Sequence, residues 1–275
     1  MGHTSIDSER LVFVGGLHRS GTTPLTTVIA AHPEVSGLHG TGVKEDEGQH
    51  LQSVYPKAKV YGGAGRFALD PRSHLTETSA LSTPENAGRL VQEWSRYWDL
   101  ERRLLLEKSP PNLVMGRFLQ GLFPGSALVV VVRHPVVVAL STHKWRRLAS
   151  RRVDRHTTHH QLVRHWIAAH DRFLEDLPRL GRTHVVRYEA LVADPVAALG
   201  PVADLLGLTS PLVSDTLVAS HSERYARQWD AMKTGNPVQR RVRRAIERDF
   251  SEQIRQWGYD TDDLSVFTCP PVLRA

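Results

Sequence analysis

The chain has 275 residues, of which 40% are hydrophobic and 23% charged, and this length can bury the core of one large α/β domain or two small ones. No apolar run reaches the roughly 18 residues that a membrane-spanning helix requires, and the N-terminal residues lack the apolar core of a signal peptide. The net charge of +6 favours an anionic ligand, since the basic residues lack the aromatic interleaving of a nucleic-acid-binding surface.

The cysteine content bears on the cellular compartment. Cys269 is the single cysteine of the sequence, which excludes an internal disulfide framework and fits a reducing environment. We therefore expect a cytoplasmic protein whose partners are small molecules rather than nucleic acid or a membrane. The sequence does not predict an oligomeric state.

Residues 11–40 begin with an apolar strand, continue through a glycine-flanked loop and enter a helical pattern over residues 24–31. A strand, a tight loop and a helix N-terminus together form an anion cradle, because backbone N–H groups and the positive end of the helix dipole converge there. A short strand over residues 35–38 follows. This segment is the first candidate for a binding site.

The loop has the spacing of a phosphate-binding loop but different chemistry. Gly16 and Gly21 are spaced as in a Walker A loop, whereas Thr22 and Thr23 stand where that loop carries lysine and a hydroxyl residue. The cation lies inside the loop instead, as Arg19.

Residues 41–84 are the least regular part of the chain, because glycines and prolines interrupt every periodic pattern. One short helix is predicted over residues 46–54, with Asp46 as its N-cap. Irregular regions of this length are usually functional or disordered, and we favour a substrate-facing lid.

From residue 84 onward, helical and apolar strand patterns alternate. The strongest strand, over residues 127–132, is uniformly apolar and is predicted to lie centrally in a sheet covered on both faces. The other predicted elements are helices over residues 84–100, 113–123, 138–147 and 154–177, strands over 104–106 and 184–188, and a helical, basic C-terminal segment over 222–275. This alternation predicts one P-loop-like, three-layer α/β/α domain spanning residues 1–275, with a central parallel sheet that binds ligands at the carboxyl ends of its strands.

Three cations fall at or just beyond the carboxyl ends of predicted strands: Arg19, Lys108 and Arg133. A P-loop kinase would need an acidic residue at the end of a neighbouring strand to hold magnesium, and Arg133 stands at that place. A cation there repels magnesium and attracts phosphate, although it could also close a structural ion pair. The sequence therefore predicts a nucleotide site built on fixed positive charge, with no metal.

These residues closely resemble the sulfotransferases that use 3′-phosphoadenosine-5′-phosphosulfate (PAPS). Three separated blocks carry the resemblance: residues 18–23 in the loop, residues 132–135 with Ser141 eight residues beyond Arg133, and residues 187–195, which include Tyr188. Together they span roughly residues 11–208. The chain is more similar to the tyrosylprotein, Golgi-type and bacterial branch than to the cytosolic phenol and steroid enzymes, which carry lysine where Arg19 stands.

The resemblance implies PAPS as donor, adenosine 3′,5′-bisphosphate as product, and transfer of a sulfuryl group to a hydroxyl or amine. The loop would grip the 5′-phosphosulfate, Arg133 and Ser141 the 3′-phosphate, and Tyr188 would lie near the nucleotide. Arg19 and Lys108 would neutralise the charge that develops during transfer. The implied nucleotide-binding residues are His18, Arg19, Ser20, Gly21, Thr22, Thr23, Arg133, Ser141 and Tyr188.

The general base is left open among four residues: Glu47 and His39, then Asp46 and His50. The glutamate that serves as base in the tyrosylprotein branch aligns with Gly40, so the resemblance does not supply it. Asp46 and Glu47 could instead cap the short helix predicted there. The glycine-rich C-terminal lid of the cytosolic enzymes is also absent, and residues 233–236 are a candidate replacement.

Two other functions remain open from the sequence: a P-loop small-molecule kinase, which Thr22 and Arg133 disfavour, and a non-catalytic nucleotide-binding sulfotransferase-like module. His156 and His160 have metal-ligand spacing, but a solvated helix face explains them more simply. The basic run 240–244 is likewise expected to be a solvated helix face rather than part of the nucleotide site. We expect the acceptor to be a small molecule, such as a secondary metabolite or carbohydrate.

Overall fold

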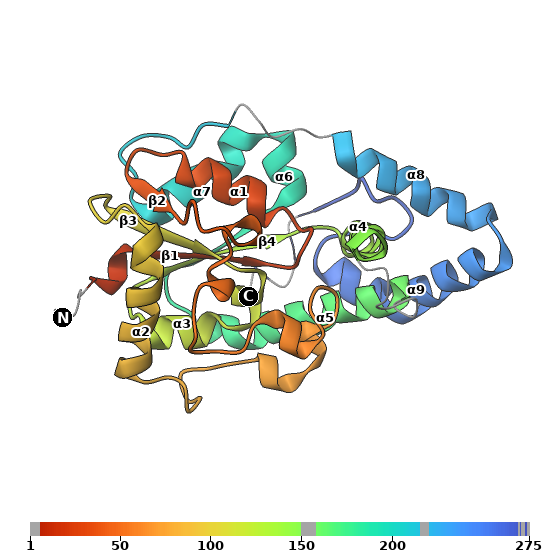
Figure 1. The fold of residues 1–275 in the computed structure, drawn as a ribbon. Coiled ribbons are helices and arrows are strands. Elements are labelled where there is room, and N and C mark those ends of the chain that lie inside the picture. The colour runs from red at the N-terminus through yellow and green to blue at the C-terminus, as the bar shows by residue number, and fades with distance from the viewer. Residues whose placement is uncertain (1–5, 150–157, 215–219, 269, 271–272, 274–275) are drawn as a thin grey trace.

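The computed structural model describes residues 6–149, 158–214, 220–268, 270 and 273. Within these residues a five-stranded sheet has the order β2-β3-β1-β4-β5, with each neighbouring pair parallel (Figure 1). The strands are β1 (Leu11–Gly16), β2 (Val35–Gly37), β3 (Leu104–Lys108), β4 (Ala127–Val132) and β5 (Thr183–Arg187). The centre of the sheet is β1, with β4 beside it, and both strands are buried along their whole length, as in a sheet covered on both faces.

Helices cover the two faces of the sheet and make a three-layer α/β/α domain (Figure 1). One face packs against α1 (Thr22–Ala30), α6 (Tyr188–Ala193) and α7 (Pro195–Leu206). The other packs against α2 (Pro84–Trp94), α3 (Gly116–Leu122) and α5 (His159–Asp176). This architecture confirms the predicted fold. None of the described helices is both long and apolar enough to cross a bilayer.

Three further helices gather at one end of the sheet (Figure 1). They are α4 (Pro135–Ala149), α8 (Ser220–Thr234) and α9 (Pro237–Gln256). The C-terminal segment predicted as helical and basic is therefore two helices, and α9 buries Ile246, Phe250 and Ile254 on one side. Asn236 forms a capping box with Gln239 at the start of α9. Of residues 233–236, the first two end α8 and the last two connect it to α9.

The helix predicted over residues 46–54 is absent, and this prediction was wrong. Residues Lys44–Asp46 and Gly48–His50 form two separate 3-10 turns instead. Glu45 and Asp46 have φ angles of +54° and +48°, in the left-handed region, so the chain changes direction where the helix was expected to begin. Asp46 does not cap this region, because its carboxylate accepts from the backbone N–H and hydroxyl of Thr41.

Several other helix ends differ from the prediction for local reasons. α1 begins at Thr22 rather than residue 24, and α4 begins at Pro135, where a proline needs no N–H partner. Residues Pro110–Val114 form a 3-10 turn before α3, and α2 ends at Trp94. Thr158 caps the described part of α5; the start predicted at residues 154–157 lies outside the described residues, as do His156 and Cys269.

Candidate active site

The loop between β1 and α1 packs closely against β4 and Tyr188, so that two of its positions have room only for glycine. A Cβ built on Gly16 would lie 2.6 Å from the carbonyl oxygen of Val131, and one built on Gly21 would lie 2.2 Å from Cδ2 of Tyr188. Gly21 also has a φ of +105°, a conformation that glycine adopts readily. The first N–H groups of α1, which have no partners within the helix, therefore lie at a fixed place beside β4 and Tyr188.

Arg133 lies directly behind this loop, at the end of β4. It is 6% exposed, and its Nη1 donates to the carbonyl oxygen of Arg19 at 3.2 Å. Its guanidinium stacks over the ring of Tyr188, 4.1 Å from the ring centroid. Burial lowers the pKa of Arg133 below its usual value, and the neighbouring Tyr188 and Glu189 oppose that shift. The strand end thus places a buried cation between the loop and Tyr188.

Arg19 reaches from the loop to α4, where its Nε donates to Ser141 Oγ at 3.1 Å. Ser141 also shares a hydrogen bond with Tyr225 of α8, whose hydroxyl accepts from Arg224 Nη2 at 3.1 Å. Burial would raise the pKa of Tyr225, but these hydrogen bonds and the nearby arginines hold it below 10. Arg19, Ser141 and Tyr225 therefore join the loop, α4 and α8 in one polar cluster.

Lys108 lies at the end of β3, next to the first turn of α1. It is 3% exposed, and its Nζ is 3.5 Å from Thr23 Oγ1. Two carboxylates approach the same ammonium: Glu47 Oε1 at 3.5 Å and Glu45 Oε2 at 3.6 Å. Lys108 thus stands between the helix N-terminus and an acidic pair.

A buried glutamate supports this arrangement from behind. Glu107 is fully buried, and its two carboxylate oxygens accept from Ser109 Oγ and Asn112 Nδ2, each at 2.6 Å. Ser109 Oγ in turn accepts from the backbone N–H of Gln49, and a Cβ on Gly48 would lie 2.4 Å from Glu107 Oε1. Burial raises the pKa of Glu107 to about 7, against the hydrogen bonds that lower it. Glu107 therefore connects β3 to the loop that carries Glu47.

These residues surround a cavity of about 740 Å³. Its lining combines the loop and the first turn of α1 with residues from the irregular region and α4. The residues that line it are His18, Arg19, Gly21, Thr22, Thr23, Pro24, Lys44, Glu45, Glu47, Gln49, His50, Ala58, Lys59, Gly63, Ala64, Pro110, Arg133, Trp145 and Tyr188. Cations, carboxylates and apolar groups all face one space of a size suited to small-molecule binding.

Most of the residues singled out in the sequence lie at this cavity or directly behind it. Lys108 and Ser141 contact lining residues, and Ser20 is buried inside the loop with no hydrogen-bond partner for its Oγ among the described residues. His18 lines the cavity, and burial lowers the pKa of its imidazole to about 4, so the ring is neutral near pH 7.

Two of the four candidate bases lie elsewhere. His39 is exposed beyond the end of β2, where its Nδ1 contacts the carbonyl oxygen of Gly37 at 3.2 Å. The Asp46 carboxylate accepts a hydrogen bond from the Thr41 hydroxyl. Neither His39 nor Asp46 lines the cavity. Glu47 and His50 do line it.

Several residues of the site were not recognised in the sequence, among them Lys44, Glu45, Trp145 and Tyr225. Lys44 Nζ lies 3.9 Å from the centroid of the Trp145 ring, and both residues line the cavity. Glu45 directly precedes two of the predicted base candidates, Asp46 and Glu47. This run of acidic residues was the one sequence signal that could have identified it. Trp145 and Tyr225 carry no local signal, because only the packing of α4 and α8 brings them here.

The histidine and arginine runs have structural partners in the described residues. His160 Nε2 lies 2.8 Å from Asp249 Oδ2, and no group of His, Cys, Asp and Glu within the described ranges is arranged to hold a metal ion. Arg243, in the run expected to be solvated, is 2% exposed and donates to the carbonyl oxygen of Trp229 and to Glu247. For Arg243 the expectation of a solvated face was wrong.

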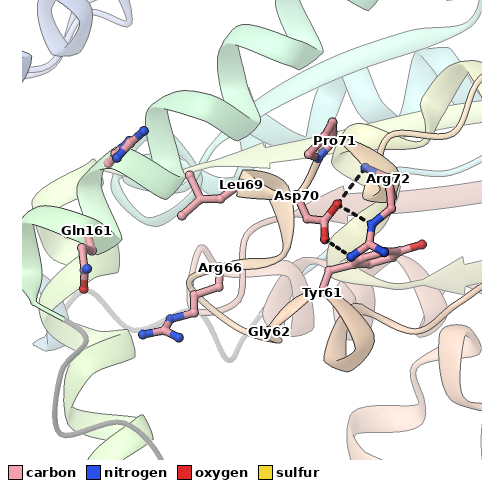
Figure 2. Close-up of a pocket in the computed structure, with 9 residues that line it drawn as sticks. Tyr61, Gly62, Arg66, Leu69, Asp70, Pro71, Arg72 and Gln161 are labelled. Atoms are coloured by element: carbon pink, nitrogen blue, oxygen red, sulfur yellow. Dashed lines mark hydrogen bonds and ion pairs between the residues drawn. The ribbon is translucent and has the colours of Figure 1, made fainter.

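A second hollow, of about 820 Å³, lies on the other side of residues 58–66. Figure 2 shows the Arg72 guanidinium directed at Asp70, with which it forms two hydrogen bonds, beside the Tyr61 ring. Arg66 and Arg164 also line this hollow. None of its lining residues comes from a strand end or from the loop before α1, so it is separate from the site above.

Comparison with known proteins identifies the family and the fold of this chain. A model of the sulfotransferase family matches residues 12–211. Sulfotransferase STF9 from Mycobacterium avium superposes with a TM-score of 0.51 at 17% identity, covering 90% of this chain and 77% of that one, and so has a similar fold. Two other solved structures also match. The sulfotransferase domain of the curacin biosynthetic pathway has a TM-score of 0.49 and 17% identity, with 86% of this chain and 96% of that one covered. The sulfotransferase from Alicyclobacillus acidocaldarius has a TM-score of 0.48 and 15% identity, with 86% of this chain and 94% of that one covered. Because the family model covers well over half of its length, the chain belongs to the sulfotransferase family.

Proposed function

We propose that this protein transfers a sulfuryl group from PAPS to a hydroxyl or amine of a small-molecule acceptor. The observation that carries the proposal is the cationic cradle, in which Arg19, Arg133 and the N-terminus of α1 meet at one cavity. A donor with phosphate and sulfate groups requires this kind of fixed positive charge.

The residues present fit such a nucleotide. Gly21 has no side chain, and its backbone packs closely on the Tyr188 ring, so Gly21 itself would not keep a ligand from the N–H groups at the helix N-terminus. Ser20 Oγ lacks a partner among the described residues, so the loop has hydrogen-bonding capacity to spare. We propose that the loop holds the 5′-phosphosulfate, and that Arg133 and Ser141 hold the 3′-phosphate.

Sulfuryl transfer forms a bond from the acceptor oxygen or nitrogen to sulfur and breaks the bond from sulfur to the phosphate oxygen. The leaving oxygen keeps the electron pair of the broken bond, so negative charge grows on it. We propose that two cations stabilise that charge: Arg19, which lines the cavity, and Lys108, whose Nζ is 3.5 Å from Thr23 Oγ1 in the first turn of α1. Adenosine 3′,5′-bisphosphate would leave.

The acceptor would occupy the part of the cavity away from the cradle. Trp145, Pro110, Ala58 and Ala64 give the cavity apolar surface, and Lys59 also lines it. This lining supports a small acceptor with an apolar body that presents its nucleophilic group to the carboxylates beside Lys108.

Ligand-induced thermal stabilisation tests the donor. Adenosine 3′,5′-bisphosphate is expected to raise the melting temperature, whereas ATP with magnesium is not. The opposite result would favour a kinase and overturn the proposal. Transfer of labelled sulfate from PAPS to a panel of acceptors tests the activity, and Arg19→Ala should lower it by about 10²-fold or more.

A further inference from the structure

Two carboxylates approach Lys108, and their surroundings differ. Glu47 is 6% exposed, and its Oε2 accepts from Gln49 Nε2 at 2.6 Å while His50 Nε2 lies 3.5 Å away. Its other oxygen faces Lys108. Both oxygens of Glu47 are thus occupied by fixed neighbours, and the residue serves as a support for the lysine.

Glu45 has a more open position. Its side chain is 39% exposed, it lines the cavity, and its Oε2 accepts from Thr23 Oγ1 at 2.7 Å. Thr23 belongs to the first turn of α1, which is the part of the cradle that would meet the sulfate end of the donor. The carboxylate of Glu45 is therefore at the boundary between the donor cradle and the acceptor part of the cavity.

The backbone holds Glu45 in this position at a cost. Glu45 and Asp46 are two of the three non-glycine residues with positive φ in the described chain. The third is Arg19, the cation of the loop. Such conformations are unfavourable for non-glycine residues and persist where the surroundings impose them, often at functional sites. Asp46 is held by Thr41, which fixes the turn from which Glu45 projects.

On these contacts we propose that Glu45 is the general base of the reaction and that Glu47 positions Lys108. This inference rests on the proposed function. As the acceptor oxygen or nitrogen forms its bond to sulfur, its proton passes to a carboxylate oxygen of Glu45, and the electron pair of the breaking bond stays with the departing bisphosphate. His50, the remaining open candidate, faces Glu47 rather than the first turn of α1.

The charges around the two carboxylates agree with different roles for Glu45 and Glu47. Burial acts to raise the pKa of Glu45, but the Thr23 hydroxyl, Lys108, Lys44 and Arg19 together hold it below 4.5. Glu45 is thus ionised near pH 7 and able to accept a proton.

Glu47 differs, because its burial raises its pKa in spite of Lys108 and Gln49, and the charge of Glu45 adds to the rise. The uncharged His18 also faces Glu45.

The test compares Glu45→Gln with Glu47→Gln and with Glu252→Gln, an exposed position on α9 that serves as the matched control. Release of bisphosphate from PAPS is measured with water alone and with phenols whose hydroxyl pKa values span several units. Glu45→Gln should reduce kcat by about 10²–10³-fold with phenols that are protonated at the assay pH, and by less than tenfold with ionised 4-nitrophenol, which needs no base. Its affinity for adenosine 3′,5′-bisphosphate should stay within threefold of the wild type.

Glu47→Gln should lower kcat for ionised and protonated phenols alike, because it disturbs Lys108 rather than proton removal. If Glu45→Gln stays within threefold of an active wild type, or loses activity equally with ionised and protonated phenols, Glu45 is not the base, although the proposed function stands. If His50→Gln lowers kcat only with protonated phenols and Glu45→Gln does not, the general base is His50. If the wild type neither binds the bisphosphate nor releases it from PAPS, the proposed function itself fails.

Discussion

The buried carboxyl of Glu107 makes the stability of this protein depend on pH in a defined direction. Its pKa is about 7 in the folded chain and 4.5 in the absence of the fold. Between these values the folded state holds more protons than the unfolded state, so the free energy of unfolding falls as the pH rises. The contribution of Glu107 is fully present below pH 4.5 and is lost as the pH passes through 7.

The size of the effect follows from the same two values. At about 1.4 kcal/mol per pH unit, the rise from 4.5 to about 7 corresponds to about 3 kcal/mol, of which about 2–3 kcal/mol falls between pH 5 and pH 8. Glu107→Gln removes the titrating group and keeps its size. Urea unfolding at pH 5 and pH 8, followed by tryptophan fluorescence, should therefore show the variant gaining about 2–3 kcal/mol relative to the wild type at the higher pH.

A difference between the two pH values isolates Glu107, because titrations shared by both proteins cancel. The amide of glutamine keeps only one acceptor oxygen for Ser109 and Asn112, which both donate to the carboxylate, and the cost of that change is present at both pH values. Glu252→Gln, on the exposed side of α9, should show no such change. If the relative stability of Glu107→Gln changes by less than 0.5 kcal/mol from pH 5 to pH 8, or changes in favour of the wild type, the argument from burial is refuted.

The remaining predictions concern the nucleotide cradle. Arg133→Lys should weaken binding of adenosine 3′,5′-bisphosphate by about tenfold or more in calorimetric titration, because lysine lacks the planar group stacked on Tyr188; unchanged affinity would contradict this. Gly21→Ala should lower the melting temperature by several degrees and abolish stabilisation by the bisphosphate, since its Cβ would meet the Tyr188 ring and its φ is positive. Tyr225→Phe should reduce affinity for the bisphosphate by about two- to tenfold, through loss of its hydrogen bonds near Ser141; an unaltered binding isotherm would exclude the hydroxyl from the site.

The parts of the fold that local pattern determines were predicted well. The apolar runs of β1, β3 and β4 identify themselves, and parallel strands bring their carboxyl ends to one edge, so Arg19, Lys108 and Arg133 were expected together and lie at one cavity or directly behind it. The prediction needed only the alternation of strands and helices, because a parallel sheet with this topology binds its ligands at the carboxyl ends of its strands.

The irregular region could not be predicted, because distant contacts determine its conformation. The turns around Gly48 depend on Glu107 and on Trp94, whose indole donates to the Gly48 carbonyl oxygen at 3.1 Å. The sequence pattern around residue 46 favours a helix cap, yet the backbone is left-handed at Glu45 and Asp46, and the Asp46 carboxylate accepts from Thr41. The same reason explains why Glu45 was overlooked while its neighbours were considered.

Lys108 shows how the acidic pair and the cradle depend on one another. Its ammonium is almost fully buried, but its distances of 3.5–3.6 Å to Thr23, Glu47 and Glu45 exceed the 2.7–2.9 Å of a charge-assisted hydrogen bond. The carboxylates therefore offset the cost of burying the charge without fixing it to one partner. If PAPS binds as proposed, a sulfate oxygen at the first turn of α1 would compete with Glu45 for Lys108 and for the hydroxyl of Thr23.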